Sequence, residues 1–536
     1  MSTGAEALIR TLVDAGITTC FSNPGTSEIH FVTALDSVPE MRPVLTLFEG
    51  VATGAADGYA RMSDAPGATL LHLGPGLGNG LANLHNARRA RVPLVNIVGD
   101  QATYHVRYDA PLQSDVETIA RNVSAWVRTS GQADELARDA VAAITAATGP
   151  PGRVATLIVP ADVFWGEGAE AAASPRPAAA RAASAENIEA IARAIRGSRR
   201  TALLLGGRAV RERGLIAAGQ IAQATRTKLL AEMFPARMER GAGLPPVERL
   251  LYWPEFASRQ LEGLEHLILV DANVPVSFFA YAGEPSLLAP PGCQIHELSP
   301  PTSDVLRSLE ELGEALDASR ATPALREASA PPLPEGSLTA EKVCQALGVI
   351  LPEGAIVSDE AITSGATLPV NTAGAPRHDW LTLTGGAIGQ GLPVALGAAI
   401  ACPDRPVIAL QADGSALYTI QSLWTMAREQ LDVTVVLFSN RAYGILNTEL
   451  ARMGAHDPGP RAKAQLELGG PDVDFVDLAT GFGVPARRAE SAEDFTGALS
   501  RAIADPGPHL IEVVVPEVPL PGAGAAAVAV RGTAAV

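Results

Sequence analysis

Two polar residues in the last third of the chain, Asp413 and Asn440, have the types and spacing of metal ligands. Each follows an apolar run, "PVIALQAD" and "VTVVLFSN", and they stand 27 positions apart. If one helix joins the two runs as parallel strands, a right-handed crossover places the strand ends side by side. A carboxylate and a carboxamide oxygen there suit Mg²⁺, and the amides of Gly414 and Ser415 at the helix start suit a phosphate. Taken alone, the pattern also fits a helix cap followed by a turn.

A second candidate element is the glycine-rich segment "LTGGAIGQGLPVALGAAI" at 383–400. Glycines let a backbone approach a ligand closely because they carry no side chain. The same composition also fits a helix start that packs against a strand.

The third candidate is Glu49, in "LTLFEGVATGAADGYARMS". We expect it to end an apolar strand and to precede a helix of Gly and Ala residues. A carboxyl group buried among apolar neighbours has a raised pKa and can share its proton with a ring nitrogen. A glutamate in this position is otherwise most often a solvated surface residue.

The elements that must position these residues are parallel strands alternating with helices. Apolar runs of four to eight residues separated by helical patterns predict parallel sheets that are buried on both faces. Two linkers rich in Ala, Pro and Ser, at 170–187 and 317–337, divide the chain into three doubly wound α/β domains. Domains are expected at 1–168, 186–316 and 337–518, followed by a tail at 519–536. Strands are expected at 18–24, 42–48, 68–74, 93–100, 154–160, 201–207, 228–233, 266–272, 294–299, 355–360, 406–413, 433–440 and 509–516.

Composition narrows the class of partner. The 536 residues carry a formal charge of −17, which disfavours nucleic acid and anionic membranes as partners and leaves a small molecule. The four cysteines form no CxxC pair, so neither a zinc site nor a disulfide framework is expected. The N-terminus reads as an amphipathic helix rather than a signal peptide, and no apolar run is long enough to span a membrane. We therefore expect a soluble, cytoplasmic protein.

Together these segments resemble the thiamine-diphosphate (ThDP) enzyme family of benzoylformate decarboxylase, pyruvate decarboxylase and acetolactate synthase. The family motif Gly-Asp-Gly, followed by Asn after a little under thirty residues, reads here as "ADGS" and "SNRAYGIL", with Ala412 at its first position. The resemblance implies that Asp413, Asn440 and the backbone carbonyl of Ala442 hold an Mg²⁺ ion on the cofactor diphosphate.

The same resemblance assigns roles to the other two segments. Ile388 would press between the two cofactor rings, and the carbonyl of Gly386 would accept a hydrogen bond from the cofactor amino group. Glu49 would protonate the aminopyrimidine, which favours the imino form that generates the reactive ylid.

Further residues are expected around the substrate and the diphosphate. Thr26, in "FSNPGTSEIHF", could bind a substrate carboxylate, and His72, in "LLHLGPGLGNG", could relay protons near neutral pH. A single histidine at a strand end is more often structural. In "IVSDEAITSGAT", three residues could reach the diphosphate: Glu360, Thr363 and Ser364. His30, His105 and Tyr443 are weaker candidates that fit structural roles better.

The resemblance runs through nearly the whole chain in domain order: pyrimidine-binding, middle and diphosphate-binding. It implies active sites built across a subunit interface, hence a homodimer at minimum and a homotetramer as is common in the family. The small residues after Glu49 would then pack at that interface. Acetolactate synthase is less similar in two places. "DAPLQSD" has Pro111 and Leu112 where that enzyme has Phe and Gln, and "GLPPVERLLYWPEFA" replaces its flavin-associated segment, so no bound FAD is expected.

The sequence thus predicts a ThDP- and Mg²⁺-dependent decarboxylase of a small 2-oxo acid that resembles benzoylformate decarboxylase and could also ligate the product. An acetolactate synthase-like carboligase is the main alternative. "GPGLGNG" after a strand also allows a dinucleotide-binding oxidoreductase, although no acidic ribose-binding residue follows it. A catalytically silent ThDP-binding regulatory subunit is the third alternative, and the presence of Glu49 argues against it.

Overall fold

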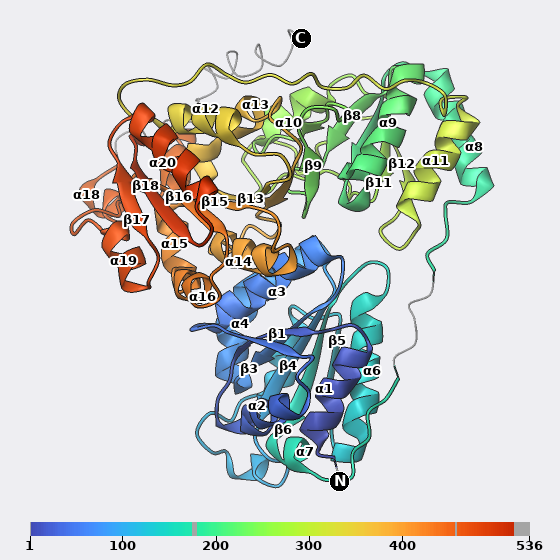
Figure 1. The fold of residues 1–536 in the computed structure, drawn as a ribbon. Helices are drawn as coiled ribbons and strands as arrows, with labels where there is room; N and C mark the ends of the chain where they lie inside the picture. Colours follow the sequence, from blue (N-terminus) through green and yellow to red (C-terminus); the bar gives the residue numbers. More distant parts are fainter. Residues whose placement is uncertain (1, 174–178, 456–457, 519–536) are drawn as a thin grey trace.

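The computed structural model describes residues 2–173, 179–455 and 458–518. The predicted tail at 519–536 and part of the first predicted linker lie outside these residues. Three sheets are arranged as in Figure 1, with the N-terminal third below and the middle and C-terminal thirds side by side above it. The three sheets fit three α/β domains, while the exact boundaries stay predictions. No helix in the described ranges has the length and apolar character needed to cross a membrane.

The N-terminal sheet has six parallel strands in the order β2-β1-β3-β4-β6-β5. In that order the strands are Arg42–Leu45, Thr19–Asn23, Gly67–Leu71, Leu94–Asp100, Val154–Pro160 and Trp126–Thr129. Its helices are α1 (Gly4–Asp14), α2 (Ile29–Ala34), α3 (Glu49–Ser63), α4 (Leu73–Ala90), α5 (Val116–Arg121), α6 (Ala133–Thr148) and α7 (Ala161–Trp165).

The middle sheet has five parallel strands in the order β10-β8-β7-β11-β12. In that order they are Glu248–Arg249, Lys228–Ala231, Thr201–Leu205, His266–Val270 and Gln294–Ser299. Its helices are α8 (Ala185–Gly197), α9 (Glu212–Thr225), α10 (Pro254–Leu261) and α11 (Val305–Ala315).

The C-terminal sheet has seven strands in the order β17-β18-β16-β15-β13-β14-β9. In that order they are Ala486–Ala489, His509–Val514, Val433–Ser439, Val407–Ala412, Ile356–Glu360, His378–Thr382 and Met238–Arg240. Its helices are α12 (Ala340–Ile350), α13 (Leu368–Asn371), α14 (Gly391–Ala401), α15 (Asp413–Thr419), α16 (Ser422–Arg428), α17 (Gly444–Arg452), α18 (Pro460–Lys463), α19 (Phe475–Gly481) and α20 (Ala492–Ala504).

The sheets differ from the prediction at their edges. β9 belongs to the middle third in sequence, yet it pairs antiparallel with β14 and so extends the C-terminal sheet. The prediction of three purely parallel sheets is therefore wrong at this one edge. The strands missed by the sequence (β5, β9, β10, β14 and β17) are short or polar, so they lack the apolar run by which a buried strand is recognised.

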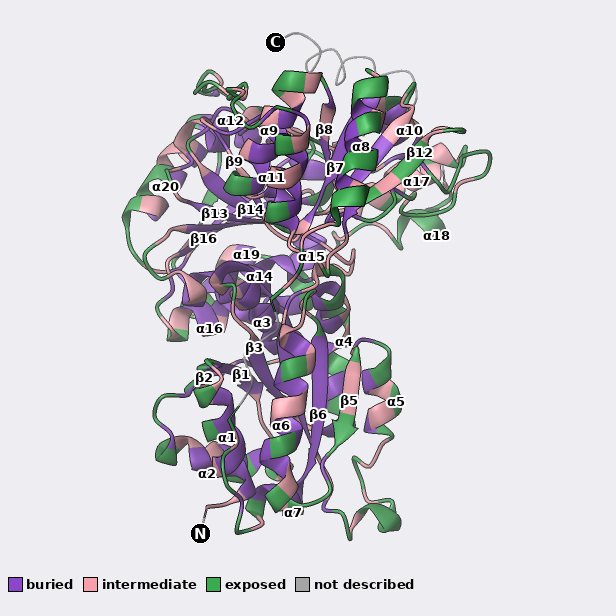
Figure 2. Ribbon diagram, turned by 90° about the vertical axis from the view of Figure 1, so that its right-hand side faces the viewer, coloured by how far each residue is buried: buried purple, intermediate pink, exposed green. Residues whose placement is uncertain are grey.

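Helix α3 packs against α14 of the same chain, and a continuous apolar core joins the N-terminal and C-terminal thirds there. Figure 2 shows both helices as buried where these parts meet. A Cβ atom added to Gly58 would lie 2.1 Å from the carbonyl oxygen of Val394, and one added to Gly397 would lie 1.9 Å from that of Ala55. The small residues therefore serve close packing within one chain. The expectation that they line a subunit interface is wrong, because α14 already covers them.

This packing predicts the effect of Gly58→Ala on stability. The added methyl group would collide with backbone rather than with a movable side chain, so the helices must separate. We expect the free energy of unfolding to fall by about 1–3 kcal/mol or somewhat more. Gly78→Ala in α4 is the matched control, because nothing lies within 4 Å of its added Cβ and alanine favours the helix by about 1 kcal/mol. Equal urea midpoints for Gly58→Ala and the parent protein would contradict the packing argument.

Candidate active site

Asp413 and Asn440 lie at the same edge of the C-terminal sheet, as their sequence positions predict. Strands β15 and β16 are parallel neighbours, Asp413 begins α15 directly after β15, and Asn440 follows β16. The Asp413 carboxylate accepts hydrogen bonds from the backbone N–H groups of Gly414 (2.8 Å) and Arg441 (2.6 Å). Burial raises the pKa of Asp413, and no ion pair is formed by its carboxylate within the described residues. A buried carboxylate without a cationic partner fits a metal ligand.

The Thr363 hydroxyl and a helix start lie close to Asn440 at this edge. Thr363 and Ser364 lie in the 3₁₀ turn η5 (Ile362–Gly365), and the Ser364 Oγ is buried without a hydrogen-bond partner in the described chain. A Cβ added to Gly444, the first residue of α17, would lie 3.0 Å from Thr363 Oγ1 and 3.6 Å from Asn440 Nδ2. The missing side chain at Gly444 leaves space among hydroxyl, amide and helix N-terminal groups. A carboxylate oxygen of Glu517, which accepts a hydrogen bond from Asn447 at 2.7 Å, lies 3.5 Å from the same added Cβ. This donor set fits a diphosphate held with a divalent cation.

The start of α15 is less open than the sequence predicts. The Ser415 hydroxyl donates to the carbonyl of Ala412 at 3.1 Å and accepts from Gln411 Nε2 at 2.5 Å. Its side chain is therefore engaged within the sheet, and only the backbone amide stays available to a phosphate. A Cβ on Gly414 would lie 2.6 Å from Tyr443 Cε1, which explains why glycine stands in the motif.

The loop at 383–390, between β14 and α14, carries the two residues expected to touch the cofactor rings. Gly386 has φ +76° and Gly389 has φ +93°, which other residues rarely adopt. Ile388 is partly exposed. The loop therefore has the backbone that a close approach to a ligand requires.

Glu360 has another role than the predicted contact with the diphosphate. Its side chain is buried, and its two oxygens accept hydrogen bonds from the backbone N–H groups of Gly389, Gln390 and Gly391 at 2.7, 3.4 and 2.6 Å. Gln411 Nε2 donates a fourth at 3.0 Å. Burial raises the pKa of this carboxyl group. Because its acceptor positions are filled, Glu360 holds the end of the 383–390 loop instead of reaching a cofactor.

In the N-terminal third, Glu49 is the first residue of α3 and is 7% exposed. Strand β2 ends at Leu45, so Glu49 begins the helix rather than ending the strand. Its Oε2 accepts a hydrogen bond from Asn79 Nδ2 at 3.0 Å, and a Cβ on Gly76 would lie 2.8 Å from its Oε1. Sequence reasoning did not identify Asn79, one turn beyond Gly76 in α4.

His72 precedes α4 and contacts a buried acid that the sequence analysis missed. Its Nδ1 lies 2.7 Å from Oε2 of Glu28, which is fully buried, and 3.3 Å from Ser27 Oγ. The hydrogen bond to Glu28 raises the pKa of His72. Glu28 also accepts the backbone N–H of Gly25 at 2.8 Å, a three-residue spacing that could have marked it as a cap. Thr26 is exposed, on the turn beside this pair.

Glu28→Gln should lower the pKa of His72. The carboxylate stabilises the imidazolium, so the proton of His72 persists to higher pH than usual, and the stability it contributes is lost as pH rises through that raised pKa. Removing the charge should move the titration midpoint of the His72 ring to lower pH. NMR titration of ring protons would test this, with His72 assigned from a His72→Gln spectrum. An unchanged midpoint would show that Glu28 does not control this histidine.

The two groups of candidates stay apart within one chain. Among the described residues, no hydrogen bond or ion pair joins Glu49 or His72 to Asp413 or Asn440. The weaker candidates have local aromatic contacts: the rings of His30 and Trp165 lie 5.3 Å apart, and those of His105 and Tyr108 lie 5.8 Å apart.

The glycines of "GPGLGNG" lie inside helix α4, not in a loop between strand and helix. A dinucleotide site needs these glycines at the strand-to-helix turn, where the backbone meets the pyrophosphate. The dinucleotide-binding alternative is therefore not supported by the geometry.

The fold pairs two α/β domains. One has a buried glutamate at a helix start, and the other has an Asp and an Asn at adjoining strand ends. This combination defines a thiamine-diphosphate-dependent type of enzyme. Comparisons with known proteins agree. The family described as "Thiamine pyrophosphate enzyme, N-terminal TPP binding domain" matches residues 2–121, and "Thiamine pyrophosphate enzyme, C-terminal TPP binding domain" matches residues 366–513.

Whole-chain relatives extend these matches. The chain is 56% identical over 514 residues to IlvX of Mycobacterium tuberculosis, provisionally named an acetolactate synthase large subunit, covering 96% of this chain and 99% of that protein. It is 29% identical to a benzoylformate decarboxylase of Pseudomonas aeruginosa, covering 96% and 99%. The solved ThDP-dependent 4-hydroxybenzoylformate decarboxylase of Rhodococcus jostii RHA1 has a TM-score of 0.85 and 25% identity, covering 97% and 100%. The chain belongs to the ThDP-dependent enzyme family of acetolactate synthase and benzoylformate decarboxylase.

Proposed function

We propose that the protein is a ThDP- and Mg²⁺-dependent decarboxylase of a small 2-oxo acid, resembling benzoylformate decarboxylase. The observation that carries the proposal is the pair formed by Glu49 and His72. Glu49 is almost fully buried at the start of α3 and accepts a hydrogen bond from Asn79 of α4, and His72 directly precedes α4 and is held by Glu28. The two residues proposed for cofactor activation and proton relay are thus located at neighbouring helix starts. Thiamine diphosphate, when bound, supplies a nucleophilic carbon and an electron sink for the bond that breaks next to the carbonyl.

In this proposal Glu49 holds a proton for the pyrimidine ring, and Asn79 fixes the carboxyl group that carries it. His72 moves a proton near the substrate, in a protonated form that Glu28 favours. Thr26, exposed on the turn beside them, would bind the substrate carboxylate through its hydroxyl. These residues divide the work into cofactor activation, proton transfer and substrate orientation.

The diphosphate would be held in the C-terminal third. Asp413, Asn440 and the carbonyl of Ala442 would bind Mg²⁺, with the amides of Gly414 and Ser415 and the hydroxyls of Thr363 and Ser364 on the phosphates. The buried, unpartnered Ser364 Oγ supports this placement. The carbonyl of Gly386 and the side chain of Ile388 would meet the cofactor rings.

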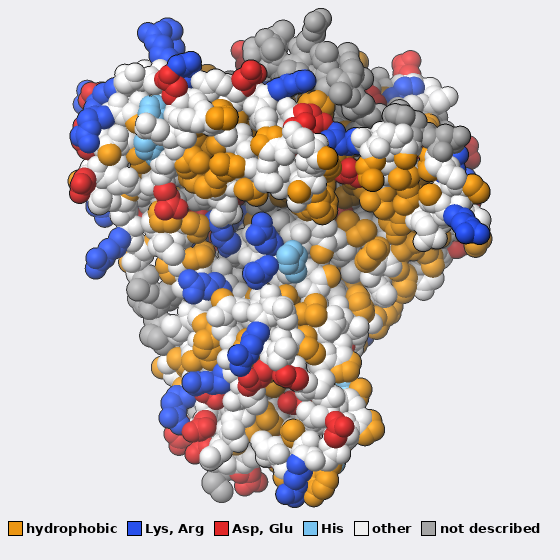
Figure 3. Space-filling view, turned by 180° about the vertical axis from the view of Figure 1, so that it is seen from behind, with side chains coloured by type: hydrophobic (Ala, Val, Ile, Leu, Met, Phe, Trp, Pro, Cys, Tyr) orange, Lys and Arg blue, Asp and Glu red, His pale blue; other side chains and the backbone are white. Residues whose placement is uncertain are grey.

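We further propose a homodimer at least, in a cytoplasmic protein, with a homotetramer as the larger candidate assembly. Leu417 and Tyr418 on α15 and Leu446 on α17 are 39%, 52% and 43% exposed, although both helices begin at the proposed cofactor site. Figure 3 shows apolar side chains gathered on the wide part of the molecule on the side of the C-terminal third. Such exposed apolar side chains support a partner surface beside the site.

A carboligase of the acetolactate synthase type is the second candidate. The 56% identity to IlvX, with its provisional name, favours it. The two reactions can share every residue proposed above. They differ in whether the carbon that has lost CO₂ takes up a proton or forms a bond to a second carbonyl compound.

The deciding experiment supplies the protein with ThDP and MgCl₂ and a panel of 2-oxo acids, and measures CO₂ together with carbon–carbon products. Cofactor-dependent CO₂ release with an aldehyde product supports the decarboxylase, and a ligated product supports the carboligase. Stoichiometric ThDP binding without turnover of any substrate would favour the silent regulatory subunit. NADH binding without any effect of ThDP would favour the oxidoreductase.

A further inference from the structure

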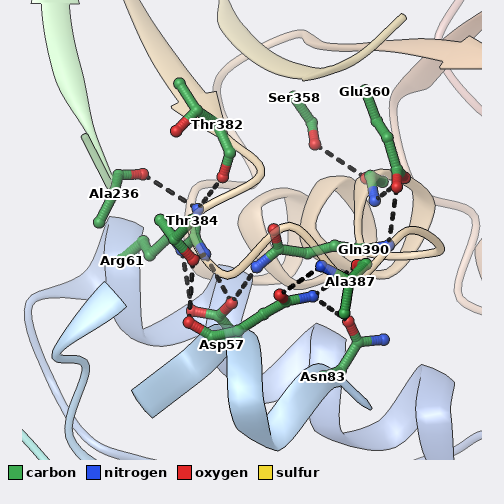
Figure 4. A network of polar contacts seen from close by, with 12 residues as sticks. Asp57, Arg61, Asn83, Ala236, Ser358, Glu360, Thr382, Thr384, Ala387 and Gln390 are labelled. Carbon is green, nitrogen blue, oxygen red and sulfur yellow. Dashed lines mark hydrogen bonds and ion pairs between the residues drawn. The ribbon is translucent and has the colours of Figure 1, made fainter. Parts of the chain in front are cut away.

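The 383–390 loop is held in place mainly by side chains from the N-terminal third of the same chain. At its start, Arg61 donates to the carbonyl of Thr382 at 2.8 Å and to Thr384 Oγ1 at 3.0 Å. At its end, Gln390 Nε2 donates to Asp57 Oδ2 at 2.6 Å. Both sets of hydrogen bonds involve side chains of α3, the helix that begins at Glu49, and Figure 4 shows these side chains converging on the loop.

Arg61 and Asp57, which form these hydrogen bonds to the loop, are also bonded to each other. They make a bidentate ion pair with N···O distances of 2.8 and 2.7 Å, and both side chains are fully buried. Arg61 Nη1 also donates to the carbonyl of Ala236 in the middle third at 3.1 Å. A buried pair with its donors satisfied in this way fixes one arrangement, because any displacement would leave a charge unpaired.

The middle of the loop is held by α4. Asn86 binds the Ala387 residue twice: its Nδ2 donates to the Ala387 carbonyl at 2.8 Å, and its Oδ1 accepts the Ala387 N–H at 3.2 Å. His85 Nε2 lies 3.1 Å from the Gly385 carbonyl, and Asn83 Nδ2 donates to the Gly389 carbonyl at 3.2 Å. The carbonyls of residues 385, 387 and 389 are thus all engaged by α4.

The two residues between these anchors are the ones expected to meet the cofactor. In the described chain no hydrogen bond takes the carbonyl of Gly386 or of Ile388. Gly386 and Ile388 thus alternate with the anchored residues 385, 387 and 389. The anchored residues therefore determine where the Gly386 carbonyl and the Ile388 side chain lie. Asn86 is central, because it fixes the residue that separates Gly386 from Ile388.

We propose that Asn86 is a positioning residue that presets the 383–390 loop for the pyrimidine end of the cofactor. The proposal rests on the proposed function, since it takes Gly386 and Ile388 as cofactor contacts. It separates two parts of the cofactor site: the loop set by Asn86 serves the ring end, while Asp413 and Asn440 serve the diphosphate end.

The test compares two probes, ThDP with Mg²⁺ and inorganic diphosphate with Mg²⁺, by calorimetric titration of the apo protein. Asn86→Asp keeps the size of the side chain but loses the donor to the Ala387 carbonyl. We expect ThDP affinity to fall roughly tenfold, because the new carboxylate cannot donate to the Ala387 carbonyl and leaves that buried acceptor unpaired. The variant also loses the 3.0 Å donation from Asn86 Nδ2 to Oδ1 of Asn83, the residue that anchors the Gly389 carbonyl. Affinity for inorganic diphosphate should stay within about twofold, because that probe does not reach the loop.

Asn86 is buried, so a second variant protects the test against misfolding. His85→Ala removes the neighbouring anchor from a partly exposed position, and it should weaken ThDP binding in the same selective way but less. Asn122→Ala is the matched control, since among the described residues the Asn122 side chain bonds only carbonyls of α5. Melting temperatures would be measured for every variant.

Selective loss of ThDP affinity in folded Asn86→Asp or, if that variant does not fold, in His85→Ala supports the proposal. Equal weakening of both probes, or no weakening of either, overturns it while leaving the proposed function intact. If the parent protein binds ThDP no better than inorganic diphosphate, the cofactor assignment itself fails, and the positioning role fails with it.

Discussion

Glu49→Gln should reduce cofactor-dependent turnover by roughly a hundredfold or more, with little change in ThDP affinity. Glutamine keeps the shape of the side chain and can still meet Asn79, but it cannot give and retake a proton at the pyrimidine ring. General acid–base groups typically contribute factors of 10² to 10⁴. The burial of Glu49 at 7% exposure supports this role, because water has little access to its carboxyl group there.

The control for this substitution is Glu40→Gln, an exposed glutamate on the loop before β2. Its turnover should equal that of the parent protein, whereas Glu49→Gln should bind ThDP and remain inactive on the same 2-oxo acids. Calorimetry for binding and CO₂ release for turnover separate the two effects. Equal turnover by Glu49→Gln and the parent would refute the proposed activation step.

Much of the fold could be predicted from sequence because buried parallel strands have a plain signature. Runs such as "TALLLGG" and "VTVVLFSN" are mostly apolar, and each forms a central strand close to its expected position. Edge strands lack that signature: β17 is "ARRA" and β10 is "ER". The transfer of β9 to the C-terminal sheet could not be predicted, since only long-range packing decides which sheet edge a three-residue strand joins.

The candidate site was predicted where spacing along the chain determines geometry. Asp413 and Asn440 follow strands joined by one crossover, so chain order alone places them together. Glu28, Asn79 and Asn86 were missed because their partners His72, Glu49 and Ala387 are distant in sequence, and local spacing does not indicate such contacts. Glu360 was assigned wrongly because its position after a strand suggests a phosphate site. Its carboxylate oxygens instead accept hydrogen bonds from backbone amides of the 389–391 segment, which is distant in sequence.

The α3–α14 contact shows how the same residues can suggest the wrong partner. Gly and Ala on α3 correctly indicate a close helix contact, yet sequence cannot tell whether the second helix belongs to the same chain. Because this contact lies within one chain, Glu49 and the 383–390 loop belong to one packed unit. A change in the packing of α3 against α14 would therefore move both together.

Asp413→Ala should weaken ThDP binding in the presence of Mg²⁺ by roughly a hundredfold or more and abolish turnover at ordinary cofactor concentrations. The carboxylate would supply the one formal negative charge among the proposed ligands, and even the loss of an outer-shell partner typically costs 10- to 100-fold in metal affinity. Asp413→Asn should lose less, since an amide oxygen can still coordinate. Asp404→Asn, at an exposed position before β15, is the control and should bind like the parent.

The metal dependence makes the Asp413 prediction specific. If Asp413 acts through Mg²⁺, then EDTA should weaken ThDP binding strongly in the parent protein and only slightly in Asp413→Ala, because the variant has already lost that contribution. A direct contact between Asp413 and the cofactor would instead leave the EDTA effect undiminished in the variant. Such a result would also contradict the fit of this buried, unpaired carboxylate to a cation, and the diphosphate would then have to be held by the α15 and α17 helix starts and the η5 hydroxyls alone.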